Sequence, residues 1–360
     1  MDTKILYIDP LNPEEGLINE AINILARGGL VAFPTETVYG LGADAYNVGA
    51  VTNIFKVKGR PMDNPLIVHI DSLSRIDDVA IDVQEYVFDL AEKVWPGPIT
   101  FILKRSPNIP REVSAGLHTI AVRCPAHSVA LRLIQGLDKP IAAPSANISG
   151  KPSPTNADHV IKELRGNIDA IIDSGDTFFG VESTVVNLLS DPPILLRPGP
   201  IGVEELRDIL GKDVVVPDFV RGLRDADTAL SPGMKHKHYT PNTNLILVEL
   251  RDYNSNDAIN RLTSKVSDLV REYSSKGFKV ALIASKETAN IYNDNVIKLI
   301  IGSRINLYEV AKNLFKTLRA IDDTKVDIAI VEGFEEKNIG LAIMNRLRKA
   351  SSKIIVINQV

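Results

Sequence analysis

The chain has a single cysteine, Cys124, in 360 residues. One thiol excludes an intramolecular disulfide and any metal site built from several cysteines, and it suits a reducing compartment. The chain also lacks an apolar run near the roughly 18 residues of a membrane span, and charged residues interrupt its first ten positions, which argues against a signal peptide. These absences predict a soluble cytoplasmic protein with no membrane partner.

Aromatic residues are scarce as well, at 6%, whereas hydrophobic residues make up 44% of the chain. The hydrophobic cores must therefore be built mainly from Ile, Val, Leu and Ala. The net charge of −4 provides no general attraction to nucleic acid or to anionic membranes.

Proline is absent from the last third of the chain, since all 21 prolines lie at or before Pro241. The charge changes too: residues 1–213 carry 19 Lys and Arg against 28 Asp and Glu, and residues 214–360 carry 22 against 17. A chain of this length is expected to form two domains. We predict a first domain over residues 1–213, a proline-rich and glycine-rich linker over 214–241, and a second domain over 242–360.

Hydrophobic patterns in the first domain predict a mixture of helices and short strands. The helices are expected over residues 13–27, 81–94, 129–135, 157–164 and 203–210, and the strands over 30–33, 66–68, 99–103, 120–122, 141–143, 170–172 and 194–196. Such a mixture, with long proline-rich loops, predicts a twisted mixed α/β sheet. Polar residues of interest stand at the strand ends, where loops commonly carry function.

The second domain has a more regular pattern. Strands are expected over residues 245–248, 280–284, 296–299, 328–331 and 354–357, with helices over 258–273, 307–321 and 339–349 between several of them. This alternation predicts a smaller, Rossmann-like, doubly wound parallel sheet. No glycine fingerprint follows the first of these strands, so the pattern does not imply NAD.

The stretch from Val31 to His69 contains the densest polar chemistry in the sequence. Thr35, Glu36 and Thr37 follow a strand, and a helix-length segment then ends in a cluster of cations. The cluster Lys58-Gly59-Arg60 offers a guanidinium fork and a point charge, which together suit phosphate. A solvated charged face explains this cluster equally well from local sequence alone. The wider set of residues favours an anion-binding site.

The segment Gly40–Ala45 formally matches the dinucleotide fingerprint GxGxxG/A. That fingerprint needs a strand that runs directly into the glycine turn, but Pro34 ends the preceding strand. We therefore interpret the segment as a glycine turn before a helix that is capped by Asn47. No Walker A motif is present, because Gly150-Lys151 lacks the upstream glycine.

Several later strands also end or begin on polar residues. Ser145 and Asn147 follow an apolar strand, Arg123 and Arg197 each end one, and Ser183 stands at the start of another. One arginine at a strand end is more often simply exposed to solvent. Two of them, together with Arg60, indicate a site.

The histidines and the cysteine give weaker signals. His69 ends an apolar strand, where a lone histidine is more often structural than catalytic. His236 and His238 have a spacing that a metal could use, but no cysteine or carboxylate completes the set, so we expect no metal site. Arg123 could lower the pKa of Cys124, yet the absence of a paired histidine motif argues against a nucleophile there.

Together these motifs resemble the YrdC-like family, in its two-domain form, the threonylcarbamoyl-AMP synthases. The resemblance covers the whole first domain and continues into the linker. It rests on PTETVYGLG, KxKGRP, NPLIVHI, WPGPIT, AVRCP, PSAN, STVV, LRPG and SPGMKHKHYTP, in this order. Several motifs in sequence are far more specific than any one of them.

The resemblance implies a nucleotidyltransferase that makes L-threonylcarbamoyladenylate and pyrophosphate from L-threonine, bicarbonate and ATP with Mg²⁺. The activated group would serve the threonylcarbamoyl-adenosine modification of tRNA beside the anticodon, through a separate transfer complex. Weak or local tRNA binding is a further expectation. By resemblance, ATP would be bound by Lys58, Arg60, Asn64, Thr119, Ser145, Asn147, Ser153, Arg197, His238 and Tyr239, with Lys58 and Arg60 catalytic, and L-threonine by Thr35, Thr37, His69, Arg123 and Ser183. The linker would close over this site as a lid.

Two other functions are considered. An RNA-binding module without chemistry is opposed by the acidic first domain, although a local basic patch could persist. The carbamoyltransferase of hydrogenase maturation contains a related domain, but that type of protein carries zinc-binding cysteines, which a chain with one cysteine cannot supply.

Overall fold

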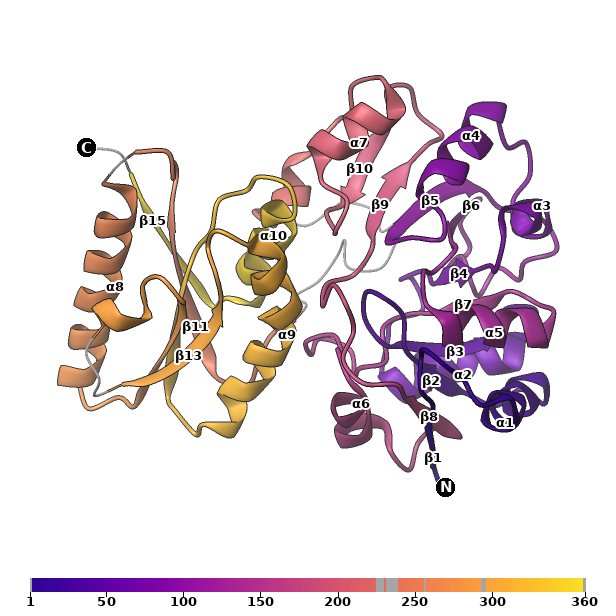
Figure 1. The fold of residues 1–360 in the computed structure, drawn as a ribbon, viewed down its shortest axis with the longest axis horizontal. Coiled ribbons are helices and arrows are strands. Elements are labelled where there is room, and N and C mark those ends of the chain that lie inside the picture. Colours follow the sequence, from indigo (N-terminus) through magenta and orange to yellow (C-terminus); the bar gives the residue numbers. More distant parts are fainter. Residues whose placement is uncertain (1, 225–229, 231–238, 256, 293–295, 359–360) are drawn as a thin grey trace. The chain divides into compact units, whose positions relative to one another are not determined.

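Short runs of Ile, Val, Leu and Ala form the strands of two separate sheets (Figure 1). The computed structural model describes residues 2–224, 230, 239–255, 257–292 and 296–358. Its first unit contains residues 2–149, 153–220 and 230, and its second contains 150–152, 221–224 and the described residues from 239 onward. His238, which the sequence predicted to bind ATP, and residues 225–229 and 231–238 of the predicted lid lie outside the described residues.

The first unit is built on one large mixed sheet, as the sequence predicted. Its ten strands have the order β1-β8-β2-β3-β7-β4-β6-β5-β9-β10. The strands are β1 (Lys4–Tyr7), β2 (Val31–Phe33), β3 (Gly40–Asp44), β4 (Ile67–His69), β5 (Ile99–Lys104), β6 (Thr119–Arg123), β7 (Ile141–Ala143), β8 (Ala170–Asp173), β9 (Thr184–Asn187) and β10 (Ile194–Arg197). The helices are α1 (Glu15–Ala26), α2 (Val48–Lys58), α3 (Ile76–Val79), α4 (Glu85–Val94), α5 (Ser128–Leu137), α6 (Ala157–Leu164) and α7 (Val203–Leu210), with 3-10 turns η1 (Leu73–Arg75) and η2 (Asp218–Arg221).

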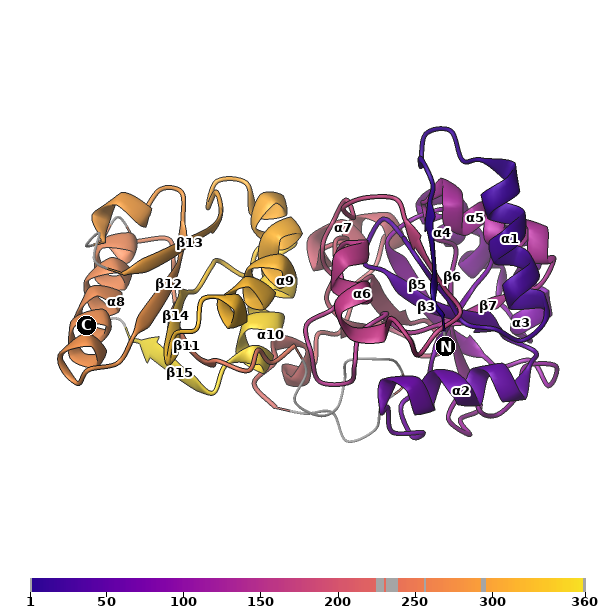
Figure 2. The ribbon, with the colours of Figure 1, turned by 90° about the horizontal axis from the view of Figure 1, so that it is seen from below.

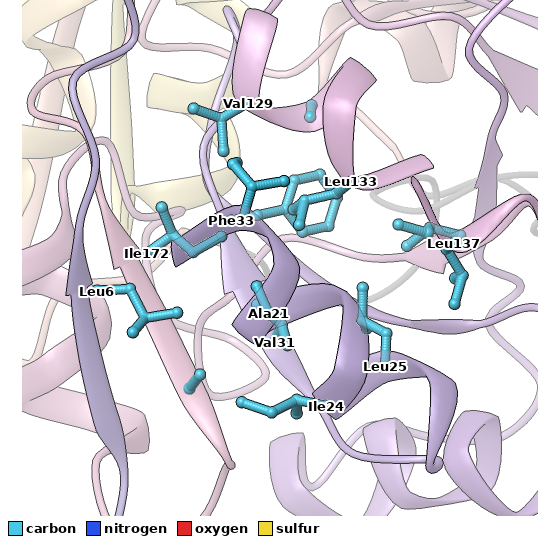
Figure 3. Packing of buried hydrophobic residues seen from close by; sticks show 14 of the residues in the cluster. Leu6, Ala21, Ile24, Leu25, Val31, Phe33, Val129, Leu133, Leu137 and Ile172 are labelled. Carbon is cyan, nitrogen blue, oxygen red and sulfur yellow. The ribbon is translucent and has the colours of Figure 1, made fainter. Parts of the chain in front are cut away.

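Helices cover both faces of this sheet, since Figure 2 shows α1 and α2 on opposite sides of it. The apolar stripes of α1 and α5 pack on β2, β7 and β8, and Phe33 lies at the centre of this core (Figure 3). Burial of this apolar surface removes it from water and fixes the sheet, whose strand ends carry the polar residues.

The segment Gly40–Asp44 contradicts the prediction, because it forms a strand, β3, and not a glycine turn. It pairs antiparallel with β2, and Phe33 stands opposite Gly40. A Cβ at Gly42 would lie only 2.7 Å from the Phe33 ring and 2.9 Å from Ile141, so the glycines make room for that ring. The predicted cap is confirmed: Asn47 accepts a hydrogen bond of 3.0 Å from the Ala50 amide.

Replacing Gly42 with alanine should lower the free energy of unfolding by about 1–3 kcal/mol, because the added methyl group overpacks the space beneath Phe33. Urea unfolding measures this difference. Gly16→Ala is the matched control, since nothing lies within 4 Å of its Cβ and helix α1 favours alanine over glycine. Equal stability of the two variants would contradict this account of β3.

The second unit contains an all-parallel sheet with the strand order β13-β12-β14-β11-β15, as predicted. Helix α8 lies on one face, and α9 and α10 lie on the other (Figure 1). The elements are β11 (Asn244–Leu250), α8 (Ala258–Ser275), β12 (Val280–Ser285), η3 (Ala289–Ile291), β13 (Ile297–Gly302), α9 (Leu307–Asp323), β14 (Ile328–Glu332), α10 (Gly340–Ala350) and β15 (Lys353–Ile357). Among the described residues no helix is long and apolar enough to cross a membrane.

A cavity of about 450 Å³ lies at the carboxyl end of β11 in this second unit. Its most buried charges are paired with one another, since Arg348 Nε lies 2.9 Å from Glu249 and Arg348 Nη1 lies 2.5 Å from Glu336. These ion pairs satisfy the most buried charges of the cavity wall within the protein itself.

Candidate active site

Strand pairing fixes two ends of a polar site on the first sheet. β4 runs parallel to β6, with His69 opposite Arg123, and antiparallel to β7, with Ile67 opposite Ala143. Residues just before β4 and just after β7 therefore lie roughly 13 Å from His69, at about 3.3 Å per residue. We call the two groups the Lys58 cluster, with Arg60, Asn64, Thr119, Ser145 and Asn147, and the Arg123 cluster, with Thr35, Glu36, Thr37, His69, Thr100, Ser183 and Arg197.

In the Lys58 cluster, the last residue of α2 holds the loop after β7. The buried Lys58 ammonium donates to the carbonyl of Ser145 at 2.5 Å and to that of Asn147. Ser145 Oγ in turn donates to Asn147 Oδ1 at 2.5 Å. Burial, and then the nearby Arg60, lower the pKa of Lys58 well below its usual range. Lys58 therefore organises the loop that the sequence assigned to the nucleotide.

Arg60 and Asn64 form the next part of this cluster. The Arg60 guanidinium donates to the carbonyls of Asn64 at 3.1 Å and Pro65 at 3.0 Å. By the register of β4 with β6, Thr119 stands level with Pro65. Within the described part of the chain, the side-chain oxygens of Asn64 and Thr119 are both buried without a hydrogen bond, and buried polar atoms normally have one. These atoms are placed to meet a polar ligand.

In the Arg123 cluster, one buried guanidinium joins three segments of the chain. Arg123 Nη1 donates to Thr37 Oγ1 at 2.9 Å, Nε donates to the Gly97 carbonyl at 3.3 Å, and Nη2 lies 2.7 Å from Glu36 Oε1. Thr37 Oγ1 also lies 2.8 Å from Thr35 Oγ1. This cation at the end of a rigid strand suits a carboxylate.

Ser183 and Arg197, which the sequence assigned to different substrates, contact each other. Arg197 donates to the Ser183 carbonyl at 3.0 Å and to its Oγ at 2.9 Å. Ser183 Oγ also lies 2.7 Å from Thr100 Oγ1. Thr100 stands on β5, one residue from Phe101, which pairs with Val122, so this group lies at the Arg123 end. The structure thus places Arg197 with the predicted threonine residues.

The loop between β2 and β3 connects the two ends. Gly40, at its end, bridges to Ser145, whereas Thr37 reaches Arg123. Tyr39 receives the Ala146 amide hydrogen bond at 2.8 Å and donates its own amide to Pro154 at 2.9 Å. The loop is buried throughout, so it folds back over the sheet and forms one wall of the site.

His69 is a neutral residue of this site. Burial, and then the neighbouring Arg123, lower its pKa to about 3. The unfolded chain takes up a proton near pH 6.5, whereas the folded chain does so only near pH 3. The stability that the neutral ring provides is therefore complete above pH 6.5 and is lost as the pH falls from 6.5 to 3.

The free energy of unfolding should accordingly fall by about 2 kcal/mol more in the wild type than in His69→Gln between pH 7 and pH 5. Urea unfolding at both pH values measures this difference. His118→Gln, at an exposed position, is the matched control and should keep the wild-type pH dependence. An unchanged pH dependence in His69→Gln would show that His69 does not titrate in this way.

The pKa of the Cys124 thiol differs from the expectation. The sequence indicated that Arg123 could lower the pKa of this thiol, but burial dominates and raises it to about 12. The thiol therefore stays protonated, which agrees with the argument against a nucleophile.

Three residues of the site had no role predicted from the sequence: Glu36, Thr100 and Glu182. Glu182 accepts a hydrogen bond of 2.5 Å from Ser153 Oγ. Thr100 ends the motif WPGPIT and Glu182 precedes STVV, so both stand beside motifs that pointed to the site.

Tyr239, which the sequence predicted to bind ATP, lies in the second unit, where its ring packs on Phe315 at 5.1 Å between ring centres. The described residues contain no group of three His, Cys, Asp or Glu side chains placed to hold a metal.

Comparison with known proteins extends over both units. Residues 23–199 match the family described as telomere recombination (Sua5, YciO and YrdC), and residues 201–352 match the C-terminal domain of threonylcarbamoyl-AMP synthase. The chain is 48% identical to the threonylcarbamoyl-AMP synthase of Pyrococcus abyssi over 95% of this chain and 96% of that protein. It is 42% identical to that of Bacillus subtilis over 99% and 100%.

A solved structure of P. abyssi Sua5 complexed with L-threonine has a TM-score of 0.91 and 45% identity, and the match covers 99% of this chain and 100% of that one. A mixed sheet with this two-ended polar site, followed by a parallel Rossmann-like domain, defines the class of two-domain YrdC-like nucleotidyltransferases. Within that class, similarity along the full length shows that the chain belongs to the threonylcarbamoyl-AMP synthase family.

Proposed function

We propose that this chain makes L-threonylcarbamoyladenylate and pyrophosphate from L-threonine, bicarbonate and ATP. The observation that carries the proposal is the site with two chemically different ends on one sheet. The Lys58 cluster supplies buried cations for phosphates, and the Arg123 cluster supplies a buried guanidinium among hydroxyl groups for an amino acid. The L-threonine bound to the P. abyssi relative supports the second assignment.

At the nucleotide end, Lys58 and Arg60 would stabilise the negative charge that accumulates on the phosphates as pyrophosphate leaves. Asn64, Thr119, Ser145, Asn147 and Ser153 would offer hydrogen-bonding groups to the nucleotide. Mg²⁺ would accompany ATP, bound in large part by the phosphates themselves, as is common for this ion. The ion would neutralise part of the phosphate charge.

At the threonine end, Arg123 would bind the carboxylate, with Thr35, Thr37, His69 and Ser183 around the amino acid. The carbamate formed from the amine would then attack the α-phosphate, in line with the leaving pyrophosphate. No covalent enzyme nucleophile is required, and the protonated thiol of Cys124 fits this route. The buried walls of the site would protect the unstable carbamate and adenylate from water.

Arg197 lies at the threonine end, where it contacts Ser183 directly. From there its positive charge would stabilise the α-phosphate during attack by the carbamate. The product would pass to a separate complex that modifies tRNA beside the anticodon, in the cytoplasm. We further propose that any binding of tRNA is weak and local.

Mass spectrometry of the product tests this function directly. Purified protein with ATP, Mg²⁺, L-threonine and bicarbonate should release threonylcarbamoyladenylate and pyrophosphate, and omission of either threonine or bicarbonate should stop both. RNA binding without ATP-dependent release of pyrophosphate would instead favour a binding module.

A further inference from the structure

Glu36 is a buried carboxylate with an unusual environment. Its side chain is 7% exposed and lies 2.7 Å from Arg123, whose side chain is 4% exposed. Despite this proximity, Glu36 Oε1, Glu36 Oε2 and Arg123 Nη2 make no aligned hydrogen bond in the described part of the chain. A buried ion pair is stabilising only when further hydrogen bonds satisfy its atoms. This pair is therefore incomplete without another polar group.

None of the residues predicted to bind L-threonine carries a negative charge that could pair with its α-ammonium group. Two threonines, a histidine, an arginine and a serine offer hydroxyls and a cation, but no anion for the α-ammonium group. His69 is neutral, because burial and Arg123 lower its pKa to about 3. Glu182, another buried carboxylate near the site, already accepts a hydrogen bond from Ser153. Glu36 is the buried carboxylate next to Arg123, which would bind the carboxylate of the substrate.

A zwitterion fits an existing ion pair well. A lone carboxylate brought to Arg123 would meet the like charge of Glu36, which is unfavourable in a buried site. An α-amino acid carries both charges on one carbon, so its carboxylate can pair with Arg123 while its ammonium pairs with Glu36. The net buried charge then stays the same, and the unaligned atoms gain charge-assisted hydrogen bonds.

We propose that Glu36 binds the α-ammonium of threonine and accepts the proton that this nitrogen loses when the carbamate forms. The inference rests on the proposed function and adds Glu36 to it as the residue that recognises the amine and accepts its proton. The N–C bond forms as the C–O bond to the hydroxyl of bicarbonate breaks. Of the three ammonium protons, one leaves with that hydroxyl as water, one passes to the Glu36 carboxylate, and one stays on the carbamate nitrogen.

Isothermal titration of Glu36→Gln with two ligands tests the first part. One ligand is L-threonine, and the other is 2,3-dihydroxybutanoate, in which a hydroxyl replaces the amine. Loss of a charge-assisted hydrogen bond should weaken L-threonine binding by about 10- to 100-fold. Binding of the amine-free analogue should stay the same or become tighter, because the substitution removes the like charge that opposes its carboxylate. Equal weakening of both ligands, or of neither, would mean that Glu36 only orients Arg123 and would overturn the proposal.

Product formation tests the second part. Glu36→Gln should lower the rate at saturating threonine by about 100-fold or more, the usual scale for a lost proton acceptor, and Glu36→Asp should restore part of that rate. Unchanged ATP binding reports that the variants are folded. Asp71→Asn is the matched variant. Asp71 is a half-buried carboxylate two residues after His69, and its Oδ1 has no hydrogen-bond partner among the described residues. Loss of threonine binding in Asp71→Asn but not in Glu36→Gln would overturn the assignment.

The proposed function itself is judged on the wild type alone. A wild type that binds threonine but makes no threonylcarbamoyladenylate would disprove the reaction and with it the proton transfer. The comparison of the two ligands would still decide whether Glu36 recognises the ammonium group.

Discussion

Lys58→Met is expected to lower formation of threonylcarbamoyladenylate by about 1000-fold. Two effects act together, because the substitution removes a cation that stabilises the phosphates and also the hydrogen bonds that hold the carbonyls of Ser145 and Asn147. Loss of one preorganised donor to a developing charge commonly lowers the rate by about 100- to 1000-fold. Pyrophosphate release at saturating ATP, threonine and bicarbonate measures the effect. The methionine side chain keeps most of the buried volume, so the protein should remain folded.

Lys56→Met is the matched control for this prediction. Lys56 lies two residues away in the last turn of the same helix α2, but its side chain is exposed. It should keep nearly the full activity, which separates the buried site from the general positive charge of the helix end. Wild-type activity in Lys58→Met would remove Lys58 from the phosphate site, and equal losses in both variants would point to helix charge alone.

Arg123→Lys is expected to weaken L-threonine binding by about 100-fold and to leave ATP binding unchanged. Lysine keeps the positive charge but cannot reproduce the planar fork with which Arg123 reaches Thr37, Gly97 and Glu36. Recognition of a planar carboxylate depends on that fork. Titration calorimetry with each substrate measures the two affinities separately, and the substrate carboxylate should account for most of the loss.

The free energy of unfolding of related variants tests the ion pair between Arg123 and Glu36. Arg123→Gln should lower the free energy of unfolding by about 3–5 kcal/mol, since it leaves the buried Glu36 carboxylate without a cation. The double variant Glu36→Gln with Arg123→Gln should recover part of that loss. Arg111→Lys, at an exposed position, should change neither affinity nor stability. Full threonine affinity in Arg123→Lys would contradict its place in the site.

The clearest difference between sequence and structure concerns the segment Gly40–Asp44. The two glycines at alternate positions indicate a turn when only the local sequence is considered, because glycine has a low propensity for strands. In the folded chain the same glycines are required by a long-range contact, the Phe33 ring that lies across them. No local pattern contains that contact, so the strand could not be predicted from the segment itself.

The contacts of Arg197 and Glu36 in the site could not be predicted from local sequence either. The motif order identified Arg197 as a site residue, but its contact with Ser183 comes from the antiparallel pairing of β10 with β9 and a bulge between Leu195 and Arg197. Glu36 is visible in the sequence between two threonines, yet its pairing with Arg123, 87 positions later, requires the loop to fold back over the sheet.

The sequence by itself determined the two α/β architectures, most of their helices and strands, and the resemblance to the family, because hydrophobic periodicity and ordered motifs are local properties of the chain. The tertiary structure decided which polar residues meet. Strand register places His69 beside Arg123 and separates them from Lys58 by the length of β4, and burial then sets the charge state of His69 and Cys124. Register and burial depend on contacts between distant segments, which is why only the folded chain could reveal them.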